Sequence, residues 1–141
     1  MISNRCTYAL KAMLELAPRE GAGPVSIGEI AREQAIPARF LEAILRQLKQ
    51  AGYTVSSRGK VGGYQLAKPA HAVSAGEIIR LFEGPLFSGG AAGRPGAATN
   101  PFASLWREAE EALGRVYDGT SFADLAARAE RARKAEADYA I

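Results

Sequence analysis

The sequence predicts a mostly α-helical protein that carries one small β-hairpin. Apolar residues recur at helical spacing in several separate stretches, and one of these is followed at once by two short strand-like runs. Residues 58–63, between those runs, are RGKVGG, a basic and glycine-rich sequence typical of a tight hairpin tip. A short helix that leads directly into a basic hairpin is the outline of a winged helix-turn-helix.

Helical spacing predicts three helices ahead of the hairpin, over residues 4–17, 26–34 and 37–51. Pro18 ends the first helix, and Ser26 with Glu29 has the spacing of a capping box at the start of the second. Gly52 ends the third helix, because glycine tolerates a left-handed cap. The buried stripe of that third helix is expected to consist of Leu41, Ile44, Leu45 and Leu48.

The two strands of the hairpin are expected over residues 53–57 and 64–67. Ser74 and Glu77 repeat the capping-box spacing and begin a fourth helix, which ends at Gly84. The predicted fold is therefore a winged helix-turn-helix domain over residues 1–83, followed by a long helix that is described below.

Positive charge is concentrated in the third helix and the hairpin. The whole chain has 141 residues and a net charge of only +3. Residues 34–70 nevertheless contain six basic residues and one acid, whereas residues 71–141 contain eight basic and ten acidic residues. A local excess of this kind is the electrostatic footprint of phosphate binding. The alternative is an ordinary solvated surface.

The chain has the features expected of a soluble protein of the cytoplasm. No apolar run approaches the roughly 20 residues of a membrane span. The first residues lack the apolar region and cleavage site of a signal peptide. The single cysteine, Cys6, excludes an intrachain disulfide, which suits a reducing compartment.

The third helix is the candidate recognition helix, because the second helix of a helix-turn-helix enters the major groove. Its exposed face is expected to present Ala38, Arg39, Glu42, Ala43, Arg46 and Lys49. Arg39 is suited to guanine, Glu42 to the amino group of cytosine and Ala43 to a thymine methyl group. Arg46 and Lys49 are expected to contact phosphates.

The hairpin tip is a second candidate DNA contact. An arginine on a narrow hairpin can enter the minor groove of A·T-rich DNA, and Arg58 is placed for this. Lys60 is expected to contact a phosphate. Gly59 and its neighbouring glycines allow the tight turn and a close approach to the DNA backbone.

The sequence changes character after the fourth helix. Residues 84–101 are rich in glycine and proline and are expected to form a flexible loop. A long apolar stripe follows, consisting of Phe102, Leu105, Trp106, Ala109, Leu113 and Val116. We expect a homodimer in which this helix packs on its symmetry mate, the alternative being that it folds back on its own domain. A short helix from Phe122 follows, and residues 135–141 are expected to form a helix end or a loose tail, which completes the predicted region 102–141.

Several motifs resemble the Rrf2 family of winged-helix transcriptional regulators. The hairpin sequence Arg58-Gly-x-x-Gly-Gly-Tyr64 is similar to the family pattern, as is the preceding PARFLEAILRQLKQAG. The similarity extends to residues 3–10 and to SAGEIIRLFEGP at 74–85, so it covers nearly the whole chain except residues 86–100. The resemblance implies a homodimeric repressor that binds a roughly palindromic operator.

The sequence departs from those family members that bind an iron–sulfur cluster. Such members carry three cysteines in the loop before the dimerisation helix, and the corresponding loop here contains none. Thiolates are the usual cluster ligands, and Cys6 and His71 are isolated in the sequence. We therefore expect no cofactor and no metal. Cys6 is a candidate redox switch, although a small buried apolar role is the preferred interpretation.

Among family members without the loop cysteines, the resemblance is nearest to a repressor of cysteine metabolism. It implies control of cysteine or sulfur metabolism with cysteine synthase, the O-acetylserine thiol-lyase, as co-regulator. The candidate partner-binding residues are Tyr139, Ala140 and Ile141. A carboxylate on an apolar residue such as Ile141 can bind a nest of backbone N–H groups that accepts an amino-acid substrate.

Three alternatives remain open. The chain could be a family regulator that senses another signal, such as nitric oxide, iron or a redox change. It could also be a winged-helix module that binds proteins without binding DNA. An enzyme is the least favoured class, because the sequence has no phosphate-cradling loop, no paired nucleophile and base, and no cluster of metal ligands.

Overall fold

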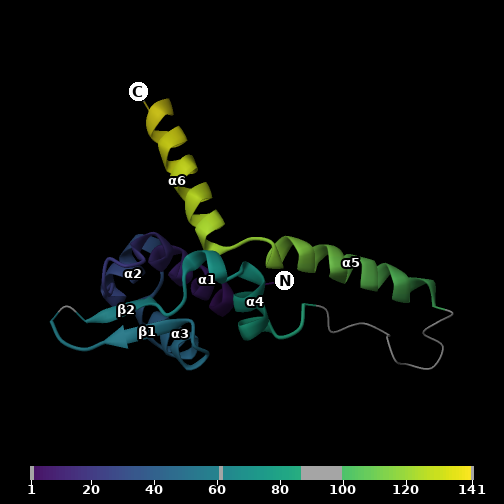
Figure 1. Ribbon diagram of the computed structural model, residues 1–141, viewed down its shortest axis with the longest axis horizontal. Coiled ribbons are helices and arrows are strands. Elements are labelled where there is room, and N and C mark those ends of the chain that lie inside the picture. Colours follow the sequence, from purple (N-terminus) through teal and green to yellow (C-terminus); the bar gives the residue numbers. More distant parts are fainter. Residues whose placement is uncertain (1, 61, 87–99, 141) are drawn as a thin grey trace.

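The computed structural model describes residues 2–60, 62–86 and 100–140, and the described residues confirm the predicted fold class. They form six α-helices, two short 3₁₀ turns and one two-stranded antiparallel hairpin (Figure 1). The elements are α1 (Asn4–Leu16), η1 (Ala17–Arg19), α2 (Ile27–Gln34), α3 (Ala38–Gln50), β1 (Thr54–Ser57), β2 (Gly63–Leu66), η2 (Ala70–Ala72), α4 (Ala75–Glu83), α5 (Pro101–Asp118) and α6 (Phe122–Tyr139). No helix within these residues is both long and apolar enough to cross a membrane.

The first helix ends close to its predicted boundary. Ser3 caps α1 by accepting a hydrogen bond from the backbone N–H of Cys6. The helix ends at Leu16, and Pro18 lies in the 3₁₀ turn that follows. The core consists of side chains from α1 to α4, the turns between them and the start of α6.

The second helix lacks half of its predicted capping box. The Ser26 hydroxyl accepts a hydrogen bond from the backbone N–H of Glu29, as the spacing predicts. The Glu29 carboxylate does not return to Ser26, because Arg19 holds it with Nη1 at 2.7 Å from Oε1. An ion pair with η1 thus competes successfully with the local cap.

Strand β2 of the hairpin is fastened to the segment just before α2. Thr54 pairs with Leu66, and Ser57 pairs with Gly63, in an antiparallel register. Beyond this ladder, Val25 and Tyr64 exchange two backbone hydrogen bonds of 2.8 Å. A Cβ on Gly63 would lie 2.1 Å from the Val25 carbonyl oxygen, so only glycine permits this close approach. The part of the hairpin next to its tip therefore has a fixed position relative to the start of α2.

The last two helices extend away from the helical body in different directions (Figure 1). Ser74 and Glu77 form the predicted capping box at the start of α4. In α5 no residue is buried, and its C-terminal end contacts α4, where Arg80 binds Asp118. The predicted flexible loop falls largely on residues 87–99, which lie outside the described residues.

The last helix is not short as predicted, and of the two alternatives for residues 135–141 the described residues form a helix end and not a loose tail. Helix α6 has 18 residues, as many as α5, and continues to Tyr139. Its first residue, Phe122, is fully buried in the core, and its backbone N–H donates to the Val73 carbonyl at 3.0 Å. Apolar periodicity fades after Ala129, but the alanine-, arginine- and glutamate-rich sequence that follows has high intrinsic helix propensity.

Candidate nucleic-acid interface

The exposed face of α3 contains all six side chains predicted for the recognition helix. Leu41, Ile44, Leu45 and Leu48 are buried on the opposite face, as the periodicity predicts. Burying that stripe turns the remaining positions outward. The exposed side chains are Ala38, Arg39, Glu42, Ala43, Arg46 and Lys49.

The hairpin tip carries the second predicted set, Arg58, Gly59 and Lys60, and all three residues are exposed. Gly59 has a φ of +112°, a conformation that strains any residue with a side chain. Its carbonyl accepts a hydrogen bond of 3.0 Å from the Gly62 backbone N–H, which closes the turn. The turn holds Arg58 and Lys60 at the outer end of the hairpin.

The recognition helix and the hairpin form one continuous basic surface. The Lys49 ammonium donates a hydrogen bond to the Ser56 hydroxyl of β1 at 2.7 Å. The hydroxyl of Thr54, at the start of β1, donates to the Leu45 carbonyl of α3 at 3.3 Å. Figure 1 shows α3 beside β1, with the hairpin extending beyond the body. DNA bound against α3 would therefore meet the hairpin as well.

The charged side chains on this surface are exposed. Glu42 and Arg46 form an ion pair of 3.3 Å, one helical turn apart. The guanidinium of Arg39 lies 4.7 Å from the centre of the Phe40 ring. Within the described residues, no salt bridge joins Arg39, Lys49 or Arg58 to an acid. Exposed arginines and lysines that are not held by an acid are available to phosphates and base edges.

The structure adds one basic residue that the sequence reasoning missed. The Arg5 guanidinium donates to the side-chain oxygen of Gln47 at 2.5 Å, so the first turn of α1 lies beside α3. The same guanidinium lies 5.8 Å from the centre of the Phe82 ring. Helical periodicity cannot reveal a contact between residues 42 positions apart. The only sequence signal was an arginine near the start of the first predicted helix.

Cys6 is fully buried, in the small cluster that it forms with Ala75 and Ile79. Burial, and secondarily the charge of Glu83, raises the pKa of its thiol to about 11. The thiol therefore remains protonated at neutral pH, which favours the packing role over the redox role.

The donor set does not fit an iron–sulfur cluster. Cys6 is the only cysteine in the sequence, and its thiol is buried and protonated. Over residues 2–60, 62–86 and 100–140, no group of three or more histidines, cysteines or acids gathers in a way that could hold a metal ion.

The predicted dimerisation and partner-binding residues lie away from this basic surface. The large residues of the α5 stripe are exposed: Phe102 by 57%, Leu105 by 49%, Trp106 by 38% and Val116 by 63%. Ala109 and Leu113 are half-buried. At the end of α6, Tyr139 is 95% exposed and Ala140 is also exposed, whereas Ile141 lies outside the described residues.

Comparison with known proteins places the chain in a family of regulators. A family model described as "Rrf2: Iron-dependent Transcriptional regulator" matches residues 2–128. The transcriptional regulator CymR of Bacillus subtilis is 36% identical over 125 residues, which is 89% of this chain and 88% of CymR. The regulator IscR of Escherichia coli is 29% identical over 130 residues, which is 88% of this chain and 78% of IscR.

Solved structures agree with the sequence matches. The structure of CymR, the global cysteine regulator of B. subtilis, superposes with a TM-score of 0.75 at 35% identity. That match covers 91% of this chain and 97% of CymR. The structure of T. potens IscR gives a TM-score of 0.77 at 32% identity and covers 94% of this chain and 90% of that protein. The chain therefore belongs to the Rrf2 family of winged-helix transcriptional regulators.

Proposed function

We propose that this chain is a transcriptional repressor that binds a roughly palindromic operator as a homodimer. The observation that carries the proposal is the continuous basic surface, in which the Lys49–Ser56 hydrogen bond joins α3 to the hairpin. Two copies would present two such surfaces, and recognition of two half-sites requires a two-fold arrangement. Membership of a family of transcriptional regulators supports the same function.

Each part of the basic surface has its own role in the proposal. Ala38, Arg39, Glu42 and Ala43, in the first turns of α3, contact base edges in the major groove. Further along the helix, Arg46 and Lys49 hold phosphates. At the hairpin tip, Arg58 enters the minor groove and Lys60 contacts a phosphate, while Gly59 permits the turn.

Two substitutions separate base reading from minor-groove contact. Arg39→Ala relaxes the base preference within the half-site, at a cost of about 1–3 kcal/mol on the preferred sequence. Arg58→Ala weakens binding mainly on duplexes with A·T-rich flanks. The measurement is fluorescence anisotropy on operators selected from a random library, with Arg131→Ala on exposed α6 as the control. If both variants lost the same amount of DNA affinity on every duplex, whatever its sequence, this division of roles would be wrong.

Dimerisation is proposed to occur through α5. The large residues of its apolar stripe are exposed from Phe102 to Val116, and no residue of the helix is buried. An exposed apolar face of this length is stabilised by a partner surface. A two-fold dimer supplies that surface with the same residues from both copies.

We also propose that the chain controls cysteine or sulfur metabolism together with cysteine synthase. Similarity to CymR, whose structure is described as that of a global cysteine regulator, supports the metabolic assignment. Tyr139 and Ala140 are exposed at the end of a helix that projects from the body, which suits presentation of the last residues to a partner. Ile141 would enter the amino-acid site of the enzyme, and O-acetylserine would compete with it.

A pull-down tests the partner directly. The full chain and a variant without residues 139–141 are each mixed with purified cysteine synthase, with and without O-acetylserine. The full chain retains the enzyme, and O-acetylserine releases it. Equal retention by the truncated variant would contradict the proposed tail contact and leave the DNA-binding proposal intact.

A second candidate signal is supported by the family model, which describes iron-dependent regulators. A response to iron, nitric oxide or redox state would need ligands other than a set of thiolates, since the sequence contains one cysteine. Operator affinity measured with and without ferrous iron under anaerobic conditions distinguishes this candidate from the cysteine-metabolism proposal.

A further inference from the structure

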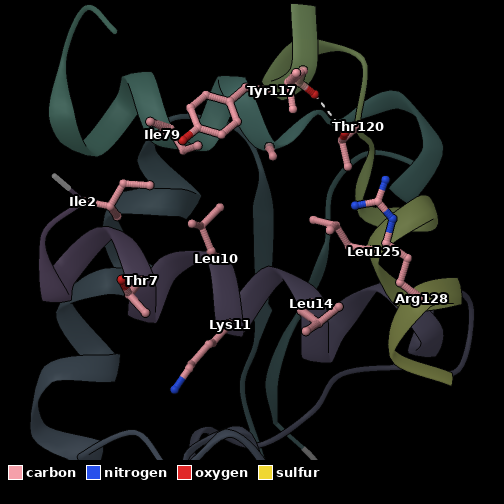
Figure 2. Close-up of a pocket in the computed structure, with 12 residues that line it drawn as sticks. Ile2, Thr7, Leu10, Lys11, Leu14, Ile79, Tyr117, Thr120, Leu125 and Arg128 are labelled. Atoms are coloured by element: carbon pink, nitrogen blue, oxygen red, sulfur yellow. Dashed lines mark hydrogen bonds between the residues drawn. The ribbon is translucent and has the colours of Figure 1, made fainter. Parts of the chain in front are cut away.

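A polar cavity of about 600 Å³ lies where the end of α1, η1 and the last turn of α2 face the middle of α6. A different flank of α6, with Leu125 and Arg128, borders a smaller apolar cavity beside α4 and the end of α5 (Figure 2). None of the described residues that line the polar cavity belongs to α5, so the proposed dimerisation stripe does not line it. A volume of this size is typical of a small-molecule site.

The inner side of the polar cavity is a network of paired polar groups. The Glu15 carboxylate accepts hydrogen bonds from the Arg19 guanidinium and from the Gln34 side-chain amide, each at 2.8 Å. The other terminal nitrogen of Arg19 donates to Glu29 at 2.7 Å. The Glu15 side chain is only 13% exposed, and both of its oxygens are engaged. A ligand that reaches this depth meets charges that are already paired, so its inner end has to be uncharged.

The outer rim of the polar cavity carries charges that are held weakly. On α6, Arg133 and Glu130 form an ion pair of 3.2 Å, and both side chains are more than half exposed. On α2, Glu33 lies 3.9 Å from Arg32, at the outer limit of an ion pair. Exposed pairs of this kind contribute little to stability, so a ligand can replace them at low cost. The rim therefore offers a guanidinium and carboxylates side by side.

We propose that the polar cavity binds a free α-amino acid with an uncharged side chain. Such a ligand carries its carboxylate and its ammonium on one carbon atom, so its site needs opposite charges next to each other. The Arg133 guanidinium binds the ligand carboxylate, while Glu130 and Glu33 bind the ammonium. The side chain of the ligand lies inward against Leu14 and Ala129, which also line the cavity. A ligand with charge of one sign would match only half of this rim.

The bound amino acid would connect α6 to the first helix of the helix-turn-helix. Glu33 lies in the last turn of α2, and α2 packs against the recognition helix α3. A ligand that joins Glu33 to Arg133 holds α2 in the position that the structure shows. Less conformational freedom is then lost when DNA binds, so operator affinity rises. This regulatory step rests on the repressor function proposed above, whereas the ligand site does not.

Isothermal titration calorimetry on the full chain tests the site, with L-leucine, L-methionine and L-glutamine as probes. At least one of them should bind with a dissociation constant of about 1 mM or lower. Two derivatives of that probe each lack one charge: the α-amide lacks the carboxylate, and the N-acetyl form lacks the ammonium. Each derivative should bind about tenfold or more weakly than the parent. If no probe binds, or if either derivative binds as well as its parent, the inference is wrong.

Three variants locate the binding in the polar cavity, with circular dichroism as the check on folding. Arg133→Gln and Glu33→Gln each remove one exposed rim charge and should lower the affinity about tenfold or more. Ala129→Trp fills the cavity from α6 and should abolish binding. The matched controls are exposed positions of α6 that do not line the cavity: Arg131→Gln, Glu136→Gln and Ala132→Trp. Unchanged binding by the two rim variants would place the ligand elsewhere and overturn the site.

Fluorescence anisotropy on a selected operator measures the regulatory step. A saturating concentration of the probe should raise the operator affinity of the wild type about fivefold or more. Arg133→Gln should lose this response, and Arg131→Gln should keep it. If the probe binds in calorimetry but operator affinity does not change, the regulatory step is wrong and the ligand site stands. If the chain binds no DNA, the repressor function fails, while calorimetry still decides the ligand site.

Discussion

Arg80 and Asp118 form a two-pronged ion pair that fastens α4 to the end of α5, with N···O distances of 2.6 and 2.8 Å. This hydrogen-bonded guanidinium lowers the pKa of the Asp118 carboxyl, and the carboxylate raises that of Arg80. Close by, the Thr120 carbonyl accepts a hydrogen bond of 2.8 Å from the Ala75 backbone N–H. The end of the proposed dimerisation helix is therefore joined directly to the winged-helix body.

The first prediction concerns Gly76, whose lack of a side chain leaves space for the Arg80–Asp118 pair. A Cβ at position 76 would lie 2.0 Å from the Asp118 carboxylate oxygen, so Gly76→Ala displaces Asp118 from Arg80. We expect the free energy of unfolding to fall by up to about 1 kcal/mol in urea denaturation, because the pair that is lost is exposed. Gly28→Ala is the control, because no atom lies within 4 Å of its Cβ position.

At Gly28 the same substitution should raise helix propensity and stabilise the protein by up to about 1 kcal/mol. Opposite signs for two glycine-to-alanine changes would locate the effect in the Arg80–Asp118 contact. Equal effects at both positions would show that Gly76 has no special steric role.

The second prediction concerns the acid dependence of stability. The pKa of Asp118 is lowered from its ordinary value of 3.8, so the unfolded chain binds a proton more readily than the folded one. The stability contributed by the pair is complete above the ordinary value and is lost as the pH falls through the lowered value. Asp118→Asn should therefore flatten the fall in stability below about pH 4.

A double-mutant cycle checks that this flattening comes from the pair. Arg80→Gln should have the same effect as Asp118→Asn, and the double variant should show little further change. The contribution of the Arg80–Asp118 pair to the free energy of unfolding is expected to be small, because both side chains are more than one-third exposed. Additive effects of the two single changes would contradict the assigned contact.

The third prediction is that Glu42 limits non-specific DNA binding. Its ion pair with Arg46, at 3.3 Å, places a negative charge on the surface proposed to face phosphates. Glu42→Gln removes that charge and releases Arg46, so affinity for random-sequence DNA should rise and the salt dependence should steepen. Preference for the selected operator should fall, because a base contact is lost.

Fluorescence anisotropy at several KCl concentrations measures both effects. Glu130→Gln is the matched control, since Glu130 forms a similar exposed ion pair of 3.2 Å with Arg133 on α6. A rise in random-sequence affinity of the same size in this control would assign the effect to net charge alone.

The fourth prediction is that Cys6 is inert. Its thiol is fully buried, and burial raises its pKa to about 11, so the reactive thiolate is scarce at neutral pH. Labelling with iodoacetamide at pH 7.5 should be slow in the native protein and rapid in guanidinium chloride. Rapid labelling of the native protein, accompanied by a change in operator affinity, would restore the redox role.

Local sequence patterns were sufficient to predict the recognition helix and the hairpin. The spacing of Leu41, Ile44, Leu45 and Leu48 identified the buried face of α3 and therefore its exposed face. Ser74 and Glu77 marked the start of α4 because a capping box involves only neighbouring residues. The glycine-rich sequence of the hairpin tip likewise signals its own turn.

Contacts between residues far apart in the sequence could not be predicted from local patterns. The Arg80–Asp118 pair spans 38 positions, and the Arg5–Gln47 contact spans 42. Glu29 was expected to complete a cap, but Arg19 binds it instead, since an ion pair within the tertiary structure outweighs a local hydrogen bond. The length of α6 was missed because helix propensity, rather than an apolar stripe, extends it to Tyr139.

The salt dependence of DNA binding tests most directly whether α3 and the hairpin form the DNA interface. The wild type is compared with a variant in which Arg39, Arg46, Arg58 and Lys60 are all alanine, on a random-sequence duplex long enough for two half-sites. The slope of log affinity against log KCl concentration should be steep for the wild type and shallower by roughly one unit for each lost phosphate contact. Equal slopes and equal affinities for the two folded proteins would contradict the account.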